Sequence, residues 1–593
     1  MIKRQACVLI VALLVAGSAY AKEKKAKTER KPSPVTLSGN LQTDFLVPES
    51  DMAIGADTEN KTDYANKYVL NNTYLDLNLY SKYVSAGARF EFLKYPLPGY
   101  VTEFRGWGVP HVFVTGKYKN MELTVGDFYE QFGSGLILRA YEERSLGIDN
   151  SLRGGRFTMT PYNGIRFKLL GGVQRNYWEW TYDQSFVLGG DLELNVDEWL
   201  QRWQENNTRL QIGLSYVMKH ENDEVIGLTK PESPNMQYYL NLPNNISAFD
   251  VRAKFQKNRY SVLAEYAYKI NDPSSMNNYT YGDGSVLLLS GSYSQRGMSV
   301  LIQAKRSENF NFRSLRSASP TNTAAYLNHL PAFTQQHTYA LPALYPYATQ
   351  PLGEWAFQGE FRYSFKRKTP LGGKYGTDVK LQYSHIRGLH RPGLNATYIG
   401  DDGFERRYFA MGTDGPNAEF FKMGALYYQD ANIEISKKFT KKFKLSGMYM
   451  YQSYNKKVIE GHGDMVDSHI FVLDAKYQHN SNLNFRGEFQ YLLKQKEEKS
   501  SSKIMSVDNN DEGDWIFGLL EISFLKSFMI TGSEMYNFKW GTHYYMAGAS
   551  YTYKSHRVQV AYARTRAGFN CSGGVCRMVP ASKGFQASYT FNF

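Results

Sequence analysis

The chain has 593 residues, a formal net charge of +13 and a mean hydropathy of -0.48. Aromatic residues are frequent, with 46 Tyr, 35 Phe and 8 Trp making 15% of the sequence. After residue 21 no run of about 18 apolar residues occurs, which excludes a helical membrane protein. A polar average combined with so many aromatic residues is typical of membrane-spanning strands, whose alternate side chains face lipid and water.

The N-terminus has the organisation of a secretory signal peptide. Two basic residues precede an apolar run over residues 6–16, and Ala19-Tyr20-Ala21 supplies the small residues that a signal peptidase recognises. We therefore predict a signal peptide over residues 1–21. Residues 22–34 are basic and contain Pro, which predicts a disordered linker. In an exported chain we expect the basic charge to meet lipopolysaccharide phosphates, and not nucleic acid.

Apolar and polar residues alternate with period two from Val35 onward. Clear examples are residues 249–256, 355–366 and 483–491, where odd-numbered positions are aromatic, aliphatic or Gly and even-numbered ones are mostly polar. A soluble β-sandwich also alternates, but its strands are shorter, with a mode of about 5–6 residues. Runs of about 10 residues favour a transmembrane barrel.

The last ten residues complete this pattern and end in Phe. A terminal aromatic residue on an alternating strand resembles the signal that outer-membrane barrels present to their insertion machinery. We therefore expect the barrel-insertion machinery to be a partner of the chain. The residues expected to form the assembly signal are Phe585, Tyr589, Phe591 and Phe593.

Connections between the predicted strands alternate between short and long. Tight turns are predicted at residues 82–85, 119–120, 162–164, 257–258, 295–296, 480–482, 525–526 and 554–556. Long polar stretches cover residues 48–67, 219–245, 307–353, 389–418, 494–513 and 568–582. This order predicts an all-β fold over residues 35–593, namely a transmembrane antiparallel up-and-down β-barrel of about 24 strands (range roughly 20–26) with short periplasmic turns and long extracellular loops. One periplasmic connection, residues 197–206, is predicted to form a short helix.

Charged residues of both signs gather between residues 126 and 156, where Gly is also frequent. Such charges cannot face lipid without a large free-energy cost. Two interpretations stay open: the segment folds into the barrel and narrows or plugs the lumen, or it is an ordinary salt-bridged external loop. The residues that would form a lumen network are Asp127, Glu130, Arg139, Glu142, Glu143, Arg144, Asp149, Arg153 and Arg156.

A second long connection, residues 307–353, contains a nearly uncharged portion, residues 330–352, that is rich in Pro, Tyr and Leu. Four roles stay open for it: folding into the barrel mouth, binding a hydrophobic ligand, contacting a partner protein, or packing on neighbouring loops. Inward positions of the clearest strands carry both signs of charge, which predicts weak ion selectivity or a filled lumen.

Removal of the signal peptide would leave two of the three cysteines, Cys571 and Cys576, in the sequence Cys-Ser-Gly-Gly-Val-Cys. An even number of cysteines in an exported chain favours a disulfide, and the loop offers too few ligands for a metal ion. Closing so small a ring stabilises a fold by only about 2 kcal/mol. We therefore predict that the disulfide shapes the last external loop and does not hold the barrel together.

Three stretches, residues 126–154, 340–355 and 568–580, resemble a Bacteroidota family of predicted outer-membrane barrels that is catalogued as a domain of unknown function. The resemblance covers essentially the whole mature chain. It implies an exported barrel integral to the outer membrane of that lineage. It carries no known ligand, catalytic residue or partner.

The sequence contains no local catalytic or phosphate-binding motif, and we predict no cofactor or metal site. The favoured function is a porin-like, non-enzymatic channel or transport barrel for small or amphipathic solutes. Two alternatives stay open: an accessory or structural subunit of an outer-membrane secretion or surface-assembly complex, and a membrane-embedded hydrolase. Expected partners are outer-membrane lipid, lipopolysaccharide and, for the first alternative, an outer-membrane protein complex.

Overall fold

The computed structural model describes residues 35–593 apart from residues 57–68, 231–232, 320–321, 392–410, 416, 496–511 and 573–574. The predicted signal peptide and the basic linker therefore lie outside the described residues. In the described part of the chain, no helix has both the length and the apolar character needed to cross a membrane.

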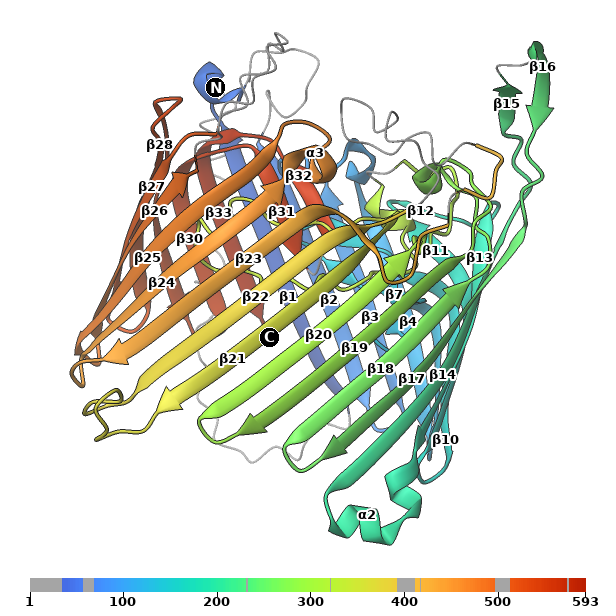
Figure 1. The fold of residues 1–593 in the computed structure, drawn as a ribbon, viewed down its shortest axis with the longest axis horizontal. Coiled ribbons are helices and arrows are strands. Elements are labelled where there is room, and N and C mark those ends of the chain that lie inside the picture. Colours follow the sequence, from blue (N-terminus) through green and yellow to red (C-terminus); the bar gives the residue numbers. More distant parts are fainter. Residues whose placement is uncertain are drawn as a thin grey trace.

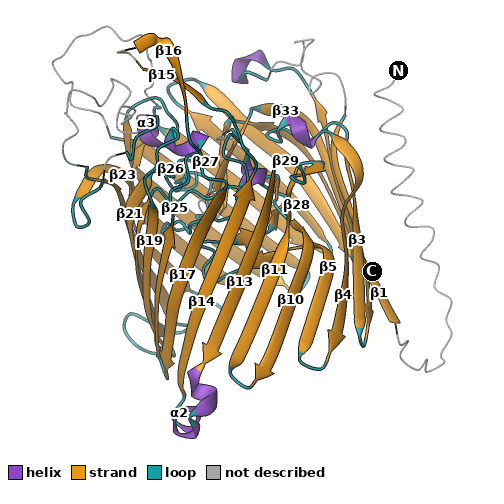
Figure 2. Cartoon of the chain, turned by 90° about the vertical axis from the view of Figure 1, so that its right-hand side faces the viewer, coloured by secondary structure: helices purple, strands orange, loops and turns teal. Residues whose placement is uncertain are grey.

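One closed antiparallel barrel accounts for most of the chain (Figures 1 and 2). Its main sheet has 25 strands, one of which, the two-residue β12 (Glu179–Trp180), pairs only with β11 and stands apart from the wall. The wall therefore has 24 strands, and the predicted fold class and strand number are confirmed. The wall strands are β1 (Val35–Pro48), β2 (Leu70–Ser81), β3 (Val84–Leu93), β4 (Gly106–Tyr118), β5 (Met121–Phe128), β10 (Leu152–Tyr162), β11 (Ile165–Asn176), β13 (Ser185–Asn195), β14 (Thr208–Glu221), β17 (Asn245–Lys257), β18 (Tyr260–Lys269), β19 (Gly284–Gln295), β20 (Met298–Glu308), β21 (Gly353–Phe365), β22 (Thr377–Leu389), β23 (Met423–Lys438), β24 (Phe443–Asn455), β25 (Met465–Asn480), β26 (Leu483–Lys494), β27 (Trp515–Phe524), β28 (Phe528–Asn537), β29 (Thr542–Tyr553), β30 (His556–Thr565) and β33 (Ser582–Asn592).

The first and last strands close the barrel. β1 pairs with β33 over the register from Asn40–Asn592 to Pro48–Gly584. The backbone of Phe593 exchanges two hydrogen bonds with that of Gly39, at 2.9 and 3.0 Å. A Cβ atom on Gly39 would lie only 2.3 Å from the Phe593 ring, so the terminal ring packs where only Gly leaves room. The predicted assembly residues therefore lie on the strand that forms this seam, and their recognition by insertion machinery stays a prediction.

The two ends of the barrel differ in their connections. All eight predicted tight turns join neighbouring wall strands at one end, which we call the short-turn end. Lys119, Asn258 and Lys554 adopt positive φ angles in three of these turns. Two further connections at this end, residues 366–376 and 439–442, were not predicted. The predicted helix is present as a 3-10 turn (Val196–Trp199) followed by α2 (Gln201–Glu205), which projects from the short-turn end in Figure 2.

Side chains of the wall alternate between an apolar outer surface and a polar interior. On β17, Phe249 and Val251 are exposed on the outside, whereas Asp250 and Arg252 between them are buried inside the barrel. Exposed aromatic and aliphatic side chains of this kind occur around the whole wall. A closed strand ladder leaves no backbone group unpaired in lipid, and the apolar outer surface matches the hydrocarbon core. The chain is therefore an integral outer-membrane β-barrel.

Several short elements lie off the wall. One hairpin, β15–β16, rises beyond the rim at the long-loop end (Figure 1), and a second, β31–β32, lies between β30 and β33. Their bounds, with those of the other short elements, are β6 (Glu130–Gln131), β7 (Arg139–Ala140), β8 (Glu142–Glu143), β9 (Ile148–Asp149), β15 (Gly227–Lys230), β16 (Ser233–Tyr239), β31 (Gly568–Ser572), β32 (Val575–Val579), α3 (Lys456–Ile459) and 3-10 turns at Met52–Ile54, Thr102–Phe104, Ser275–Asn277 and Thr323–Ala325.

Candidate functional site

Two connections of the long-loop end fold back into the barrel and fill part of its lumen. They are residues 129–151, between β5 and β10, and residues 309–352, between β20 and β21, and we call their described residues the plug. Figure 2 shows these loops inside the ring of strands. Phe132, Leu136 and Leu138 of the first segment and Phe312 and Leu341 of the second are buried in one apolar cluster with inward side chains of the wall. Of the interpretations left open by the sequence, the structure thus shows in-folding for both segments.

The depth of the plug can be followed along the inward faces of the strands. On β25 every inward residue from Val466 to Asp474 is buried, whereas the next inward side chain, Lys476, is 55% exposed. On β17 the same change occurs between Arg252, which is buried, and Lys254, which is exposed. Along β17 and β25 the plug therefore covers the inward face of the wall in the half nearer the long-loop end. The half nearer the short-turn end is a polar vestibule.

Hydrogen bonds tie the plug to the wall and its two segments to each other. The Ser134 backbone N–H and hydroxyl both donate to the carboxylate of Glu265 on β18, with an N–Oε1 distance of 2.9 Å. Asn328 Nδ2 donates to the Leu136 carbonyl at 2.7 Å, which links the second segment to the first. The Leu341 N–H donates to Gln490 Oε1 on β26 at 2.8 Å. Together these contacts span the lumen.

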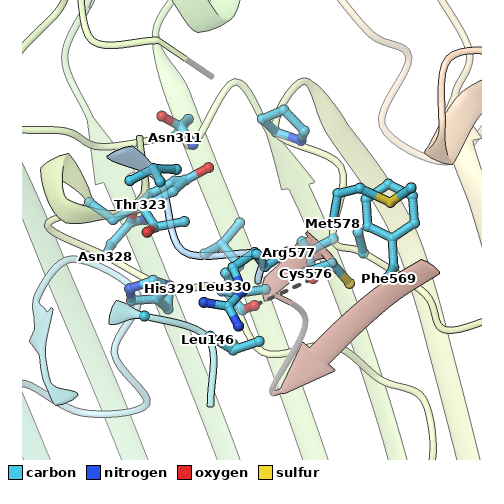
Figure 3. A pocket seen from close by; sticks show the side chains of 18 of the residues that line it. Leu146, Asn311, Thr323, Asn328, His329, Leu330, Phe569, Cys576, Arg577 and Met578 are labelled. Carbon is cyan, nitrogen blue, oxygen red and sulfur yellow. Dashed lines mark hydrogen bonds between the residues drawn. The ribbon is translucent and has the colours of Figure 1, made fainter. Parts of the chain in front are cut away.

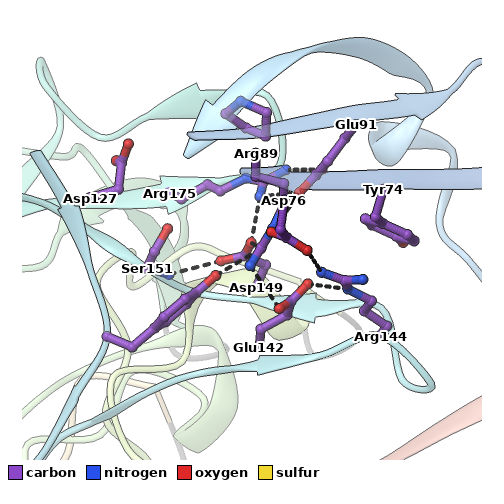
Figure 4. Close-up of polar contacts among 12 residues, drawn as sticks. Tyr74, Asp76, Arg89, Glu91, Asp127, Glu142, Arg144, Asp149, Ser151 and Arg175 are labelled. Atoms are coloured by element: carbon purple, nitrogen blue, oxygen red, sulfur yellow. Dashed lines mark hydrogen bonds and ion pairs between the residues drawn. The ribbon is translucent and has the colours of Figure 1, made fainter. Parts of the chain in front are cut away.

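A network of buried ion pairs attaches the first plug segment to β2, β3 and β11 (Figure 4). Arg175, whose side chain is 0% exposed, contacts Asp149 at 2.6 Å and Glu91 at 2.8 Å. Arg89 contacts Asp149 at 3.2 Å and Glu142 at 2.9 Å. Asp149 and Glu142 belong to the plug and the arginines to the wall, so these ion pairs cross the boundary between them.

Two further residues complete this network. Asp76 of β2 pairs with Arg89 at 2.6 Å and with the plug residue Arg144 at 2.7 Å. Arg144 also contacts Glu142 at 2.6 Å. Three guanidinium groups thus share four carboxylates, and a buried charge is tolerated only when it is paired in this way.

The two plug carboxylates of the network differ in their electrostatic environment. Burial raises the pKa of the Glu142 carboxyl, and Arg89 and Arg144 offset this only in part. Burial acts in the same direction on Asp149, but Arg175 and Arg89 outweigh it and hold the pKa of Asp149 below its usual range. Of these two plug carboxylates, Glu142 is therefore the first to take up a proton as the pH falls.

The structure brings together seven of the nine residues predicted for a lumen network, in three groups. Glu142, Arg144 and Asp149 belong to the network described above. Asp127 pairs with Arg153 at 2.8 Å on the adjacent strands β5 and β10. Glu130 contacts Arg156 at 3.2 Å and Lys168 at 3.0 Å.

The other two predicted residues make local contacts. The Arg139 guanidinium lies over the ring of Tyr141, 4.4 Å from its centroid. Glu143 accepts hydrogen bonds from Ser145. Four residues of the network, Asp76, Arg89, Glu91 and Arg175, are not among the nine predicted residues, because each lies on an ordinary wall strand. Only their place in a network that includes the in-folded segment distinguishes them from other inward charges.

Buried charges also anchor the second plug segment and the loops around it. Lys305 and Glu354, both with 0% exposed side chains, pair at 2.9 Å where the segment leaves and re-enters the wall. The Tyr347 hydroxyl of the plug donates to Glu354. The Arg316 side chain of the plug contacts Glu221 on β14 at 3.1 Å. These contacts place the second segment in the barrel mouth.

The hairpin β31–β32 lies against both plug segments. A disulfide joins Cys571 and Cys576, which are paired across the hairpin. Gln336 Nε2 of the second segment donates to the Cys571 carbonyl at 3.3 Å, and Arg577 Nη2 donates to the Ser145 carbonyl of the first at 3.0 Å. The disulfide therefore lies in a hairpin that covers the plug. In the described residues no group of three or more His, Cys, Asp or Glu side chains is placed to hold a metal ion.

The solved structures that are similar to the chain include three outer-membrane proteins. The siderophore receptor PirA from Pseudomonas aeruginosa is 10% identical, with 95% of this chain and 81% of that chain covered and a TM-score of 0.40. The P pilus usher translocation pore PapC is 9% identical, with 94% and 99% covered and a TM-score of 0.39. OccAB3 from Acinetobacter baumannii is 10% identical, with 94% and 99% covered and a TM-score of 0.33. No curated protein matches the chain. A family model matches residues 2–593, and the chain therefore belongs to the family described as Family of unknown function (DUF6029).

Proposed function

We propose that the protein is a gated transport barrel of the outer membrane for small or amphipathic solutes. The observation that carries the proposal is the partly filled lumen: the chain's own plug covers the inward faces of β17 and β25 near the long-loop end, and a polar vestibule lies below it. Porins of about 16–18 strands leave an aqueous channel. A wall of 24 strands would therefore conduct freely unless something closed it.

The contacts of the plug suit a closure that can open. Charged and polar groups, such as Glu265 and Arg175, hold the plug to the wall. When the plug moves away from the wall, water molecules can form hydrogen bonds with the charged groups that the plug leaves. These groups therefore stay paired in the open state, which keeps the free-energy cost of opening low. In the vestibule, Lys254 is exposed, and the exposed Arg362 pairs with Glu360. This mixed lining supports weak charge selectivity.

A reversible crosslink between the plug and the wall tests the gate. Ser134→Cys with Glu265→Cys would join the plug tip to β18, in a background that carries Cys571→Ser and Cys576→Ser. In planar bilayers we expect occasional openings in the reduced protein, none in the oxidised protein, and recovery after reduction. Equal conductance of the oxidised and reduced forms, or no openings in any form, would contradict the proposal.

A matched crosslink controls for stiffening of the wall. Asn40→Cys with Asn592→Cys would join β1 to β33 at positions that face each other in the seam, where Asn40 Nδ2 donates to Asn592 Oδ1 at 2.7 Å. This crosslink touches no plug residue, so its oxidation should leave the openings unchanged. Openings lost in both crosslinked variants would indicate an effect of the wall.

One observation favours a second function, that of an accessory subunit in an outer-membrane protein complex. Met236 and Tyr239 on the projecting hairpin β15–β16 are exposed, beyond the rim of the barrel (Figure 1). A pull-down of the native protein, with and without residues 226–240, tests this function. A partner recovered in a fixed ratio only with the intact hairpin would support it.

The signal peptide and the Bacteroidota origin belong to the same proposal. They are supported by the N-terminal pattern and by the resemblance of residues 126–154, 340–355 and 568–580. N-terminal sequencing of the protein isolated from outer membranes should begin at Lys22. Any other start would show that the cleavage site was wrongly predicted.

A further inference from the structure

A cavity of about 470 Å³ lies between the plug and the hairpin β31–β32 (Figure 3). Its lining is mainly apolar and includes Tyr100, Phe310, Leu330, Phe569 and Met578, and the described residues that line it include no Asp or Glu. Cavities that hold small ligands measure about 300–1,000 Å³ and combine an apolar lining with a few polar groups. The size and lining of this cavity therefore suit a small organic molecule.

Three lining residues present buried polar atoms that have no hydrogen-bond partner among the described residues. These atoms are Nε and Nη1 of Arg577, Nε2 of His329 and Oδ1 of Asn311. His329 is only 3% exposed. Leaving a buried donor or acceptor unpaired costs about 1–3 kcal/mol, so such atoms are rare in native structures unless a ligand or water pairs with them.

The Arg577 guanidinium is held in place, and its Nε and Nη1 are buried without a hydrogen-bond partner among the described residues. Its Nη2 donates to the Ser145 carbonyl at 3.0 Å, and the group lies over the Tyr100 ring, 4.5 Å from the centroid. Gly99 and Gly147, both with positive φ, lie beside it, and Cβ atoms there would come within 3.2 Å of Nε and 2.9 Å of Nη1. A larger residue at either position would therefore collide with the guanidinium group.

The charge of the cavity indicates the sign of the ligand. Burial lowers the pKa of the Arg577 guanidinium and lowers the pKa of His329 to about 3. His329 is therefore neutral at physiological pH, whereas Arg577 remains a cation. With no carboxylate in the lining, an anion from solution can supply the missing counter-charge.

We propose that this cavity binds a small organic carboxylate with an aromatic or aliphatic body. The carboxylate accepts charge-assisted hydrogen bonds from Arg577, which are stronger than those between neutral groups. The body packs against the aromatic and aliphatic lining, and His329 and Asn311 pair with its polar substituents. The inference rests on the proposed function, because it names the class of solute that the barrel would admit.

Binding of 2-naphthoate to the full chain in lipid nanodiscs tests the inference, followed by the fluorescence of the probe. The neutral 2-naphthamide has the same rings and serves as the matched probe. We expect saturable binding of one 2-naphthoate per barrel and at least about tenfold weaker binding of 2-naphthamide. Non-saturable uptake, as into lipid, or equal affinity for both probes would overturn the inference.

Two substitutions and a control locate the binding. Arg577→Gln should weaken 2-naphthoate binding at least about tenfold and leave 2-naphthamide binding unchanged, since only the charge is lost. Leu330→Trp should weaken both probes by filling the cavity. Arg296→Gln removes the same charge from an exposed turn at the short-turn end and should change neither. Wild-type affinity for 2-naphthoate in both the Arg577 and Leu330 variants would exclude this cavity.

Binding and conductance can fail separately. Probe binding with no openings in any crosslinked or reduced form would contradict the gate and leave the carboxylate site in place. Openings that respond to the crosslink, without probe binding, would contradict the carboxylate site and leave the gate. Folding of each variant is checked by its slower migration on gels after boiling.

Discussion

Replacing Asp149 by Asn should loosen the plug without opening the barrel wall. Asp149 accepts contacts from Arg175 at 2.6 Å, Arg89 at 3.2 Å and the Ser151 N–H at 3.2 Å. Asn keeps the size of the side chain but removes its charge. Two buried guanidinium groups thereby lose one of their carboxylates, while the 24-strand ladder is untouched.

The size of the effect follows from the partners that remain. Breaking a buried ion pair outright costs about 3–5 kcal/mol. Arg175 keeps Glu91 at 2.8 Å, and Arg89 keeps Asp76 at 2.6 Å, so we expect a smaller loss of about 2–3 kcal/mol. At about 1.4 kcal/mol per factor of ten, the population with a detached plug should rise roughly 30- to 150-fold.

Limited proteolysis with trypsin measures this population. Arg144 lies within the plug network, and cleavage there should follow the fraction of molecules with a detached plug when opening is fast. The matched control is Glu534→Gln, whose side chain is 58% exposed and pairs with His543 on the wall, where an ion pair is worth about 0–1 kcal/mol. If both variants are cleaved at Arg144 at the wild-type rate, the network does not hold the plug.

Three further predictions concern the seam, the pH and the disulfide. Phe593→Ala should lower the amount of heat-modifiable barrel in the outer membrane. Gly39→Ala should do the same, because its Cβ would collide with the Phe593 ring. Normal amounts of both variants would show that the seam does not need this packing. Folding lowers the pKa of His329 from 6.5 to about 3. Between these two pH values the unfolded chain binds more protons than the folded protein does. The stability of the plug should therefore fall as the pH is lowered from 6.5 toward 3. Tryptic cleavage of the plug, normalised to the cleavage of a small peptide substrate at the same pH, should therefore accelerate at pH 5 relative to pH 7, and the His329→Phe variant should lack this part of the pH dependence. Cys571→Ser should leave the barrel assembled but speed proteolysis of its hairpin, by up to about 30-fold for a loss of about 2 kcal/mol; unchanged proteolysis would assign the disulfide no role in shaping the hairpin.

The wall strands could be predicted because the environment of each residue, lipid or lumen, depends only on its position along its own strand. Lipid on one side and water or polar groups on the other impose alternation, as on residues 249–256, and every hairpin needs residues that tolerate a tight turn. The turns at Lys119 and Asn258 illustrate this, since both adopt positive φ. The longer turn at residues 366–376 was not predicted, because its mixed polar sequence resembles a loop of either end.

The plug could be foreseen only as one of two interpretations. Residues 126–156 carry a charge pattern that satisfies either a lumen or an external loop, and the choice depends on partners more than 50 residues away, such as Asp76 for Arg144. The cavity beside Arg577 had no local signal. It is formed by residues near positions 100, 146, 310, 330 and 576, which come together only when the barrel closes around the plug.

Each plug segment is inserted between two wall strands that remain paired up to the ends of the insert. Phe128 pairs with Leu152 on either side of the first segment, and Glu308 pairs with Gly353 on either side of the second. Each insert could therefore be exchanged for a short turn while the register of the wall stays the same. Mutation and selection can thus alter permeability independently of barrel assembly, and an engineer could excise one insert at a time to obtain pores of graded width.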